Sequence, residues 1–221
     1  MAQRHLVALA IVVMVGGWPS HATAQPPQLS APKTVQEWLL REHRFLRRYL
    51  VVVQQATHDY MYDYKTPTLL MPVAIDLFTG YVAPIHEMEQ GMLYETLRPH
   101  LTSEDQLQTR HLLEVEQREQ VDSVKSWQRE LVQVEQGKRK LSQVATDTID
   151  YFGRLVNRHL VLQEERLFPL LDLLTPAEQA KILKDLEQLE RSQFGPKWRA
   201  RYEQLLTYIE GEIKAIAGRI W

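Results

Sequence analysis

From Thr34 to Leu174 the chain consists of long segments in which apolar residues recur at helical spacing, with short breaks between them. These segments cover about residues 34–58, 68–97, 103–136 and 140–174. We find no convincing strand-like alternation of apolar and polar residues in the sequence. Long amphipathic helices joined by short turns bury their apolar faces by packing against antiparallel neighbours. The sequence therefore predicts an all-α fold, an antiparallel four-helix bundle.

Two of the predicted helices begin with capping signals, and one contains helix breakers. The spacing of a capping box occurs twice, at Thr34 with Glu37 and at Ser103 with Gln106. Gly80-Tyr-Val-Ala-Pro84 falls inside the second helix and predicts a kink there. The predicted buried stripe of the first helix consists of Trp38, Leu39, Leu46, Tyr49, Leu50 and Val53.

Two additional helices are predicted after the bundle. Thr175-Pro176-Ala177-Glu178 is a strong helix start, and Gly195-Pro196 ends the fifth helix. We assign residues 34–195 to the bundle domain and 196–221 to a C-terminal amphipathic helix. Its apolar face consists of Trp198, Tyr202, Leu205, Leu206, Ile209, Ile213, Ile216 and Ile220. This face is expected to pack on the bundle; a homodimer or a contact with a protein partner is the alternative.

Residues 1–24 have the pattern of a secretory signal peptide. A short polar start precedes the apolar run Leu6–Gly17, and Ala22-Thr23-Ala24 is a small-residue cleavage site. The apolar run is too short to span a bilayer, so no stable membrane insertion is expected after cleavage. An uncleaved anchor is the alternative. Residues 25–33 read as a proline-rich, extended leader. The mature chain is expected to be exported, which in a Gram-negative host means the periplasm.

The composition excludes several kinds of site. The sequence has no cysteine, which rules out disulfides, iron–sulfur clusters and thiolate metal sites. The formal net charge is −2 and basic residues are interleaved with acids, so nucleic acid is not an expected partner. Any transition metal must therefore be bound through nitrogen and oxygen atoms.

One histidine falls inside each of the four long segments: His43, His86, His111 and His159. Apolar residues lie three or four positions from His43, His86 and His159, whereas the surroundings of His111 are mixed. A single histidine on such a face is usually a hydrogen-bonded core residue. Four of them, one per helix, need partners in the core, and a shared metal is the simplest common partner.

The spacing of these histidines repeats. Gln90 lies four residues after His86, and Gln163 lies four residues after His159. Each half of the bundle thus contributes one lone histidine and one His-x-x-x-Gln pair. Two equivalent half-sites facing each other are a typical arrangement for a dinuclear metal centre.

The segment Tyr151–Pro169 resembles the fourth helix of hemerythrin-like (HHE cation-binding) domains. Glu42-His43-Arg44 and His86-Glu-Met-Glu-Gln90 resemble the first two ligand-bearing helices of that family, and the resemblance extends from about Val35 to Gly195. It implies a four-helix bundle holding two irons through histidines and bridging carboxylates, which binds or senses dioxygen, nitric oxide or iron. By this resemblance the four histidines match ligand positions.

The sequence departs from the family at Gln90 and Gln163, where a glutamate is usual. A neutral amide cannot bridge two cations as a carboxylate does. Glu164, at a spacing that hemerythrins also use, or Glu89 could substitute. Alternatively the site binds a lower-valent or different metal, or it is a metal-free histidine–glutamine network. Tyr94 shares the face of Gln90 and either packs in the core or hydrogen-bonds a ligand.

The predicted function is an exported metal-binding protein, with two irons or another divalent metal, that carries or senses a diatomic ligand or the metal itself. The expected metal-binding residues are His43, His86, Gln90, His111, His159, Gln163 and Glu164. An enzyme is the less favoured interpretation; it would be a di-metal oxidase, peroxidase or nitric-oxide scavenger. A metal-free helical interaction module is a further alternative.

Overall fold

The computed structural model describes residues 31–61, 70–144 and 149–217. The described residues are helical and include no strand, so the all-α prediction is confirmed. Pro32–Trp221 forms one compact unit. The predicted signal peptide and residues 25–30 of the leader lie outside the described residues. No helix in the described ranges combines the length and the apolar character needed to cross a membrane.

The main helices lie close to the predicted boundaries. In chain order, the elements are α1 (Val35–Met61), α2 (Leu70–Leu77), η1 (Phe78–Val82), α3 (Ala83–Met88), η2 (Glu89–Tyr94), α4 (Glu95–Leu97), η3 (Arg98–His100), α5 (Glu104–Glu135), α6 (Leu141–Val144), α7 (Asp150–Leu162), η5 (Gln163–Leu167), η6 (Phe168–Leu173), α8 (Pro176–Gln193) and α9 (Trp198–Ala217). The stretches η1, η2 and η5 are π-helical, and η3 and η6 are 3₁₀-helical.

The second predicted helix contains two wide, π-helical turns. The first, η1, leads into Pro84, which has no N–H to donate and whose ring crowds the carbonyl of Gly80. The second, η2, begins at Glu89 and has no comparable sequence signal. The helical run that begins with α7 is interrupted in the same way. Its continuation η5 is π-helical, and η6, which contains Pro169, is 3₁₀-helical.

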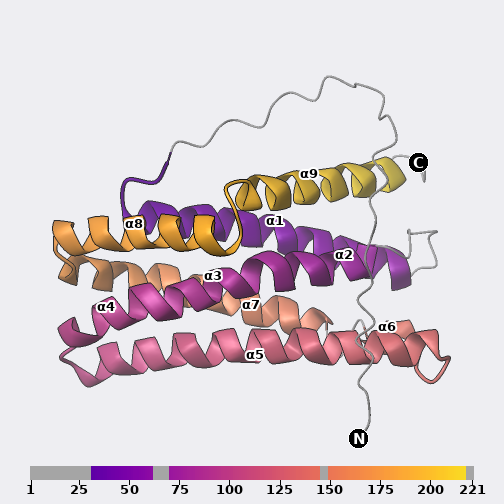
Figure 1. Cartoon of the computed structure of the whole chain (residues 1–221). Helices are drawn as coiled ribbons and strands as arrows, with labels where there is room; N and C mark the ends of the chain where they lie inside the picture. The colour runs from indigo at the N-terminus through magenta and orange to yellow at the C-terminus, as the bar shows by residue number, and fades with distance from the viewer. Residues whose placement is uncertain (1–30, 62–69, 145–148, 218–221) are drawn as a thin grey trace, which may run out of the picture. The chain divides into compact units, whose positions relative to one another are not determined.

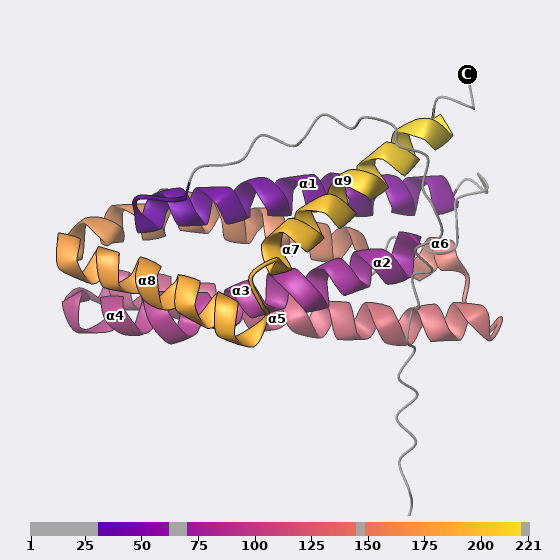
Figure 2. The same cartoon turned by 45° about the horizontal axis from the view of Figure 1, so that its top comes forward.

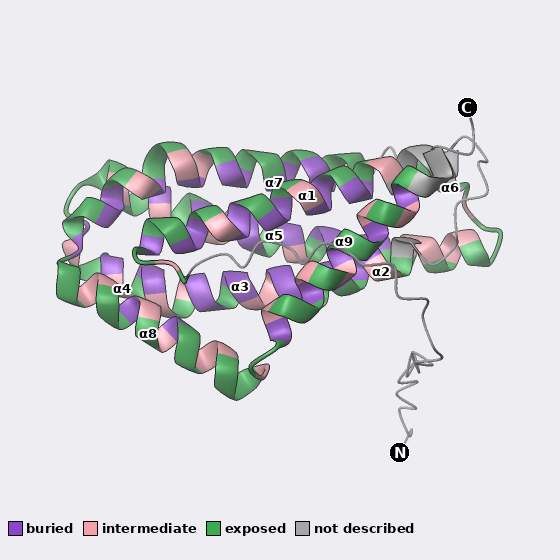
Figure 3. Cartoon of the chain, turned by 90° about the horizontal axis from the view of Figure 1, so that it is seen from above, coloured by how far each residue is buried: buried purple, intermediate pink, exposed green. Residues whose placement is uncertain are grey.

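The long helices lie side by side (Figures 1 and 2). Helix α5 packs along α7, and α1 contacts both α2 and α7. Helix α8 contacts α1 and η2, and α9 contacts α1 and α2. Buried residues lie on the faces that the helices turn toward one another (Figure 3). The predicted apolar stripe of α1 is buried in full.

Helix α9 packs on the main helices through its apolar face. The buried members of that face are Trp198, Tyr202, Leu206, Ile209 and Ile213. Trp198 Nε1 donates to the carbonyl oxygen of Gly80 over 2.9 Å. A Cβ atom at Gly80 would lie 1.9 Å from the Tyr202 hydroxyl oxygen. The absence of a side chain at this position therefore allows α9 to approach η1.

Candidate metal centre

Three of the four predicted histidines lie buried in the core, on three different elements. His43 is on α1, His86 on α3 and His159 on α7, and none is more than 3% exposed. The ring centroids of His86 and His159 are 5.4 Å apart. The structure does not bring His111 to this cluster, because its side chain is exposed on α5. The predicted residues thus converge from three of the four long helical runs.

His43 is enclosed on both sides of its ring. Its Nε2 atom lies 2.6 Å from Oε1 of Gln163, and its Nδ1 atom lies 2.8 Å from Oε1 of Glu164. The ring stacks on Phe168 with centroids 5.5 Å apart. Both neighbouring oxygens are acceptors, and a neutral imidazole has one N–H to donate. A neutral imidazole therefore donates to one of these two oxygens at a time.

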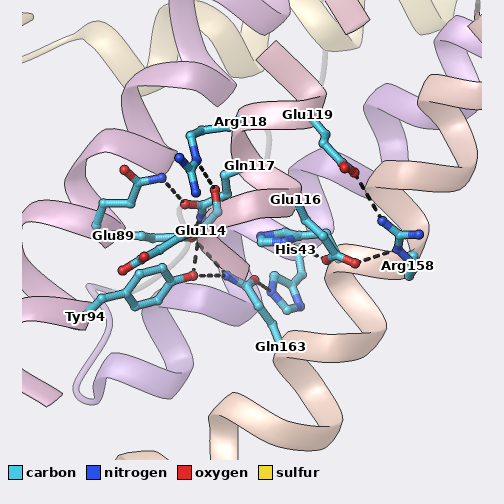
Figure 4. Close-up of polar contacts among 12 residues, drawn as sticks. His43, Glu89, Tyr94, Glu114, Glu116, Gln117, Arg118, Glu119, Arg158 and Gln163 are labelled. Atoms are coloured by element: carbon cyan, nitrogen blue, oxygen red, sulfur yellow. Dashed lines mark hydrogen bonds and ion pairs between the residues drawn. The ribbon is translucent and has the colours of Figure 1, made fainter. Parts of the chain in front are cut away.

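Gln163 connects His43 to a buried carboxylate. Its Nε2 atom donates to Oε2 of Glu89 over 3.0 Å and to the Tyr94 hydroxyl oxygen over 3.2 Å (Figure 4). Gln117, on α5, donates to the same two oxygens over 2.5 and 3.3 Å. Burial raises the pKa of Glu89 to about 8. Glu89 is therefore a core group, and Tyr94 both packs in the core and belongs to this network.

Gln90 is hydrogen-bonded to this group through Gln117. It is half-buried, and its Nε2 atom donates to Oε1 of Gln117 over 2.7 Å. Glu164 lies at the edge of the centre, with a side chain 32% exposed. Of the two acids expected as alternative ligands, Glu89 therefore lies in the core and Glu164 is a peripheral partner of His43.

Helix α5 contributes polar residues that the sequence reasoning missed. Oε2 of Glu116 lies 3.3 Å from Nδ1 of His159, and Oε1 of Glu116 accepts from Nε of Arg158 over 2.5 Å. Burial opposes ionisation of Glu116, but its contacts with His159 and Arg158 outweigh this effect and lower its pKa. Gln120 is fully buried, and neither atom of its amide group has a hydrogen-bond partner among the described residues.

The spacing of buried residues along α5 could have identified this face. Leu113, Glu116, Gln120, Ser123 and Trp127 alternate in steps of three and four, and all are buried. His111 precedes Glu116 by five positions, which rotates it about 140° away on a helix. Because the residues at both ends of this stripe are apolar and buried, the polar residues between them on the same face are expected to lie in the core as well.

Three imidazole nitrogens in the centre have no hydrogen-bond partner among the described residues: both ring nitrogens of His86, and Nε2 of His159. Unpaired buried polar atoms are costly. Burial lowers the pKa of both histidines, and for His86 the proximity of His159 adds to the effect. Neutral imidazole is the form that binds metals. Within the described ranges, no three acidic or histidine side chains are gathered closely enough to form a ready-made metal cage.

The two interior polar residues on these helices begin π-helical turns. Glu89 is the first residue of η2, three positions after His86, and Gln163 is the first residue of η5, four positions after His159. Wide turns of this kind occur frequently at functional sites. In both halves a π-helical turn therefore begins within about one helical turn after a core histidine, although the spacing is three residues in one half and four in the other.

Comparisons with protein families, with curated proteins and with solved structures gave no match. The chemistry of the centre is therefore interpreted from its own residues.

Proposed function

We propose that this chain is an exported, hemerythrin-like metal-binding protein. It would hold two irons or another divalent metal between α1, α3, α5 and α7. In this role it would bind, carry or sense a diatomic ligand or the metal itself. The observation that carries the proposal is the pair of buried histidines, His86 and His159. Their ring centroids are 5.4 Å apart, and together they have three nitrogens without a hydrogen-bond partner among the described residues. Glu116, which contacts His159, and the core residue Glu89 supply carboxylates.

The charges of the candidate ligands suit divalent ions. The positions matched by the family resemblance offered histidines and amides, with Glu164 as a peripheral acid. Glu89 and Glu116 add two carboxylates in or beside the core. Carboxylates compensate adjacent cations where the dielectric constant is low, which is the role that Gln90 and Gln163 cannot fill.

The proposed arrangement of helices is an antiparallel four-helix bundle. Its four runs would be α1, the run from α2 to α4, α5, and the run from α6 to η6. The packing of α5 on α7, and of α1 on α2 and α7, supports this arrangement. Helices α8 and α9 would then lie outside the bundle.

Each part of the chain has a distinct role in this proposal. Bound iron would supply a coordination position for a diatomic ligand. His86 and His159 provide nitrogen donors, and Glu116 fixes the orientation of His159 through its Nδ1 atom. Glu164 does the same for His43. Tyr94 and Gln163 keep hydrogen-bonding groups next to Glu89.

The test is the metal content of the protein, purified without a metal-affinity tag and analysed by elemental mass spectrometry with a visible spectrum in air. We expect about two metal ions per chain, as in dinuclear helical bundles. The His159→Ala variant should lose the metal, and the His111→Ala variant should retain it because His111 is exposed. Absence of metal after anaerobic ferrous loading would refute the proposal and favour a metal-free interaction module.

A further inference from the structure

A pocket of about 360 Å³ lies beside the candidate centre, between the α3–η2 segment and α5. Its buried lining includes His86 and Gln117, and Gln90 is half-buried in it. Charged, exposed side chains line its outer part. His86 is 3% exposed, and both of its ring nitrogens lack a hydrogen-bond partner among the described residues. The pocket therefore connects solvent with an unpaired, buried imidazole.

The His43 side of the centre is closed by contrast. Gln163 and Glu164 occupy the two nitrogens of His43, and Phe168 covers its ring. A molecule that approaches from solvent thus meets free imidazole nitrogens at His86 and paired ones at His43. The two sides of the centre differ in access.

We propose that this pocket is the binding and access site for a small uncharged molecule, which reaches the centre at His86. The inference rests on the proposed function, because it identifies the side from which the ligand of that centre approaches. It also identifies the class of ligand.

The size and the charges of the pocket define this class. Its volume of about 360 Å³ is roughly ten times the share of one water molecule in the liquid. Its charged lining is balanced between the acids Glu87 and Asp122 and the bases Arg118 and Lys125. Lys125 Nζ lies 3.2 Å from the carboxylate of Asp122. A balanced lining gives no net attraction for an anion or a cation, so uncharged molecules are favoured.

Two amides separate the pocket from the inner carboxylate. Gln90 donates to Gln117 over 2.7 Å, and Gln117 in turn donates to Glu89 over 2.5 Å. Both glutamines line the pocket, whereas Glu89 does not. An occupant therefore meets His86 and the amide pair before it meets Glu89.

The test uses the full chain without metal and a small uncharged reagent for imidazole, diethyl pyrocarbonate, with peptide mass spectrometry to follow each histidine over time. Among His43, His86, His111 and His159, His111 should react fastest because it is exposed, His86 next through the pocket, and His43 and His159 slowest. A Val121→Phe substitution fills the pocket and should slow the reaction at His86 about tenfold or more, because access then requires local opening of the core.

A matched control separates access from stability. Val132→Phe, at an exposed position of the same helix, should leave the rate at His86 unchanged. Ala83→Leu fills the pocket from the opposite helix and should act like Val121→Phe. If His86 reacts no faster than His43, or if neither filling variant slows it, the access route is refuted.

The iron-loaded protein gives a second measurement. Val121→Phe should slow the binding of nitric oxide, an uncharged ligand, and leave the iron content unchanged. Normal labelling of His86 in a chain that takes up no iron would overturn the proposed function while the access pocket stands. Iron uptake without an effect of Val121→Phe on either rate would overturn the pocket alone.

Discussion

Replacing Glu89 with glutamine should have opposite effects on the metal-free and the metal-loaded protein. Burial raises the pKa of Glu89 from 4.5 to about 8, so between these values the native state holds a proton that the unfolded chain has released. The stability of the metal-free wild type therefore falls as the pH rises through this window. At about 1.4 kcal/mol for each pH unit, the full loss approaches about 5 kcal/mol.

Glutamine removes this loss, because it has the shape of the protonated acid and no charge to bury. Its carbonyl oxygen can still accept from Gln163 and Gln117. We expect Glu89→Gln and the wild type to be about equally stable at pH 5. At pH 9 the variant should be the more stable by several kcal/mol, with about 5 kcal/mol as the upper limit. Urea unfolding of the metal-free proteins at pH 5, 7 and 9 measures this difference.

The control is Glu87→Gln, two residues away and exposed, which should show no such dependence on pH. A stability difference between Glu89→Gln and the wild type that stays constant from pH 5 to pH 9 would refute the reasoning. In the metal-loaded protein Glu89→Gln should reduce the metal content, because the site loses an anionic ligand. An unchanged metal content would exclude Glu89 as a ligand.

Three further predictions concern the fold. Gly80→Ala should destabilise the protein by about 1–3 kcal/mol in thermal unfolding, since its Cβ would collide with Tyr202. Adding Tyr202→Phe should restore only part of this lost stability, because a ring carbon of residue 202 would itself lie 2.6 Å from the Cβ. Thr175→Ala should cost about 1 kcal/mol in urea unfolding, because it removes the cap of α8. Arg199→Met should cost about 3 kcal/mol, because the buried carboxylate of Glu42 would keep only Arg41 and the Tyr81 hydroxyl as partners, and adding Glu42→Gln should recover part of this loss.

The helix starts could be predicted because the interactions that make them are local. Ser103 and Gln106 form both hydrogen bonds of a capping box, and so do Thr175 and Glu178. At Thr34 the cap differs in one detail, since the side chain of Glu37 accepts the N–H of Lys33. Each motif lies within five residues, so no knowledge of tertiary packing is required.

The interior polar residues were harder to predict, because their positions depend on how regular each helix is. With regular α-helical spacing, Gln90 shares the face of His86. In the structure the wide turn of η2 begins at Glu89, which lies in the core, whereas Gln90 lines the pocket. Pro84 signals the wide turn of η1, and Pro169, which follows η5 at the same spacing, signals that of η5. Nothing comparable in the sequence around Glu89 signals η2.

The contribution of α5 shows a general limit of reading periodicity from apolar residues alone. Glu116, Gln117 and Gln120 lie in the core, although by type each belongs among surface residues. They are placed there by Leu113 and Trp127, which are buried at both ends of the same stripe. Polar groups held in a core in this way require polar partners from neighbouring helices. The polar stripe of α5 and the core histidines therefore form one joint signal, and reading them together would have favoured Glu116 over His111 as the contribution of this helix.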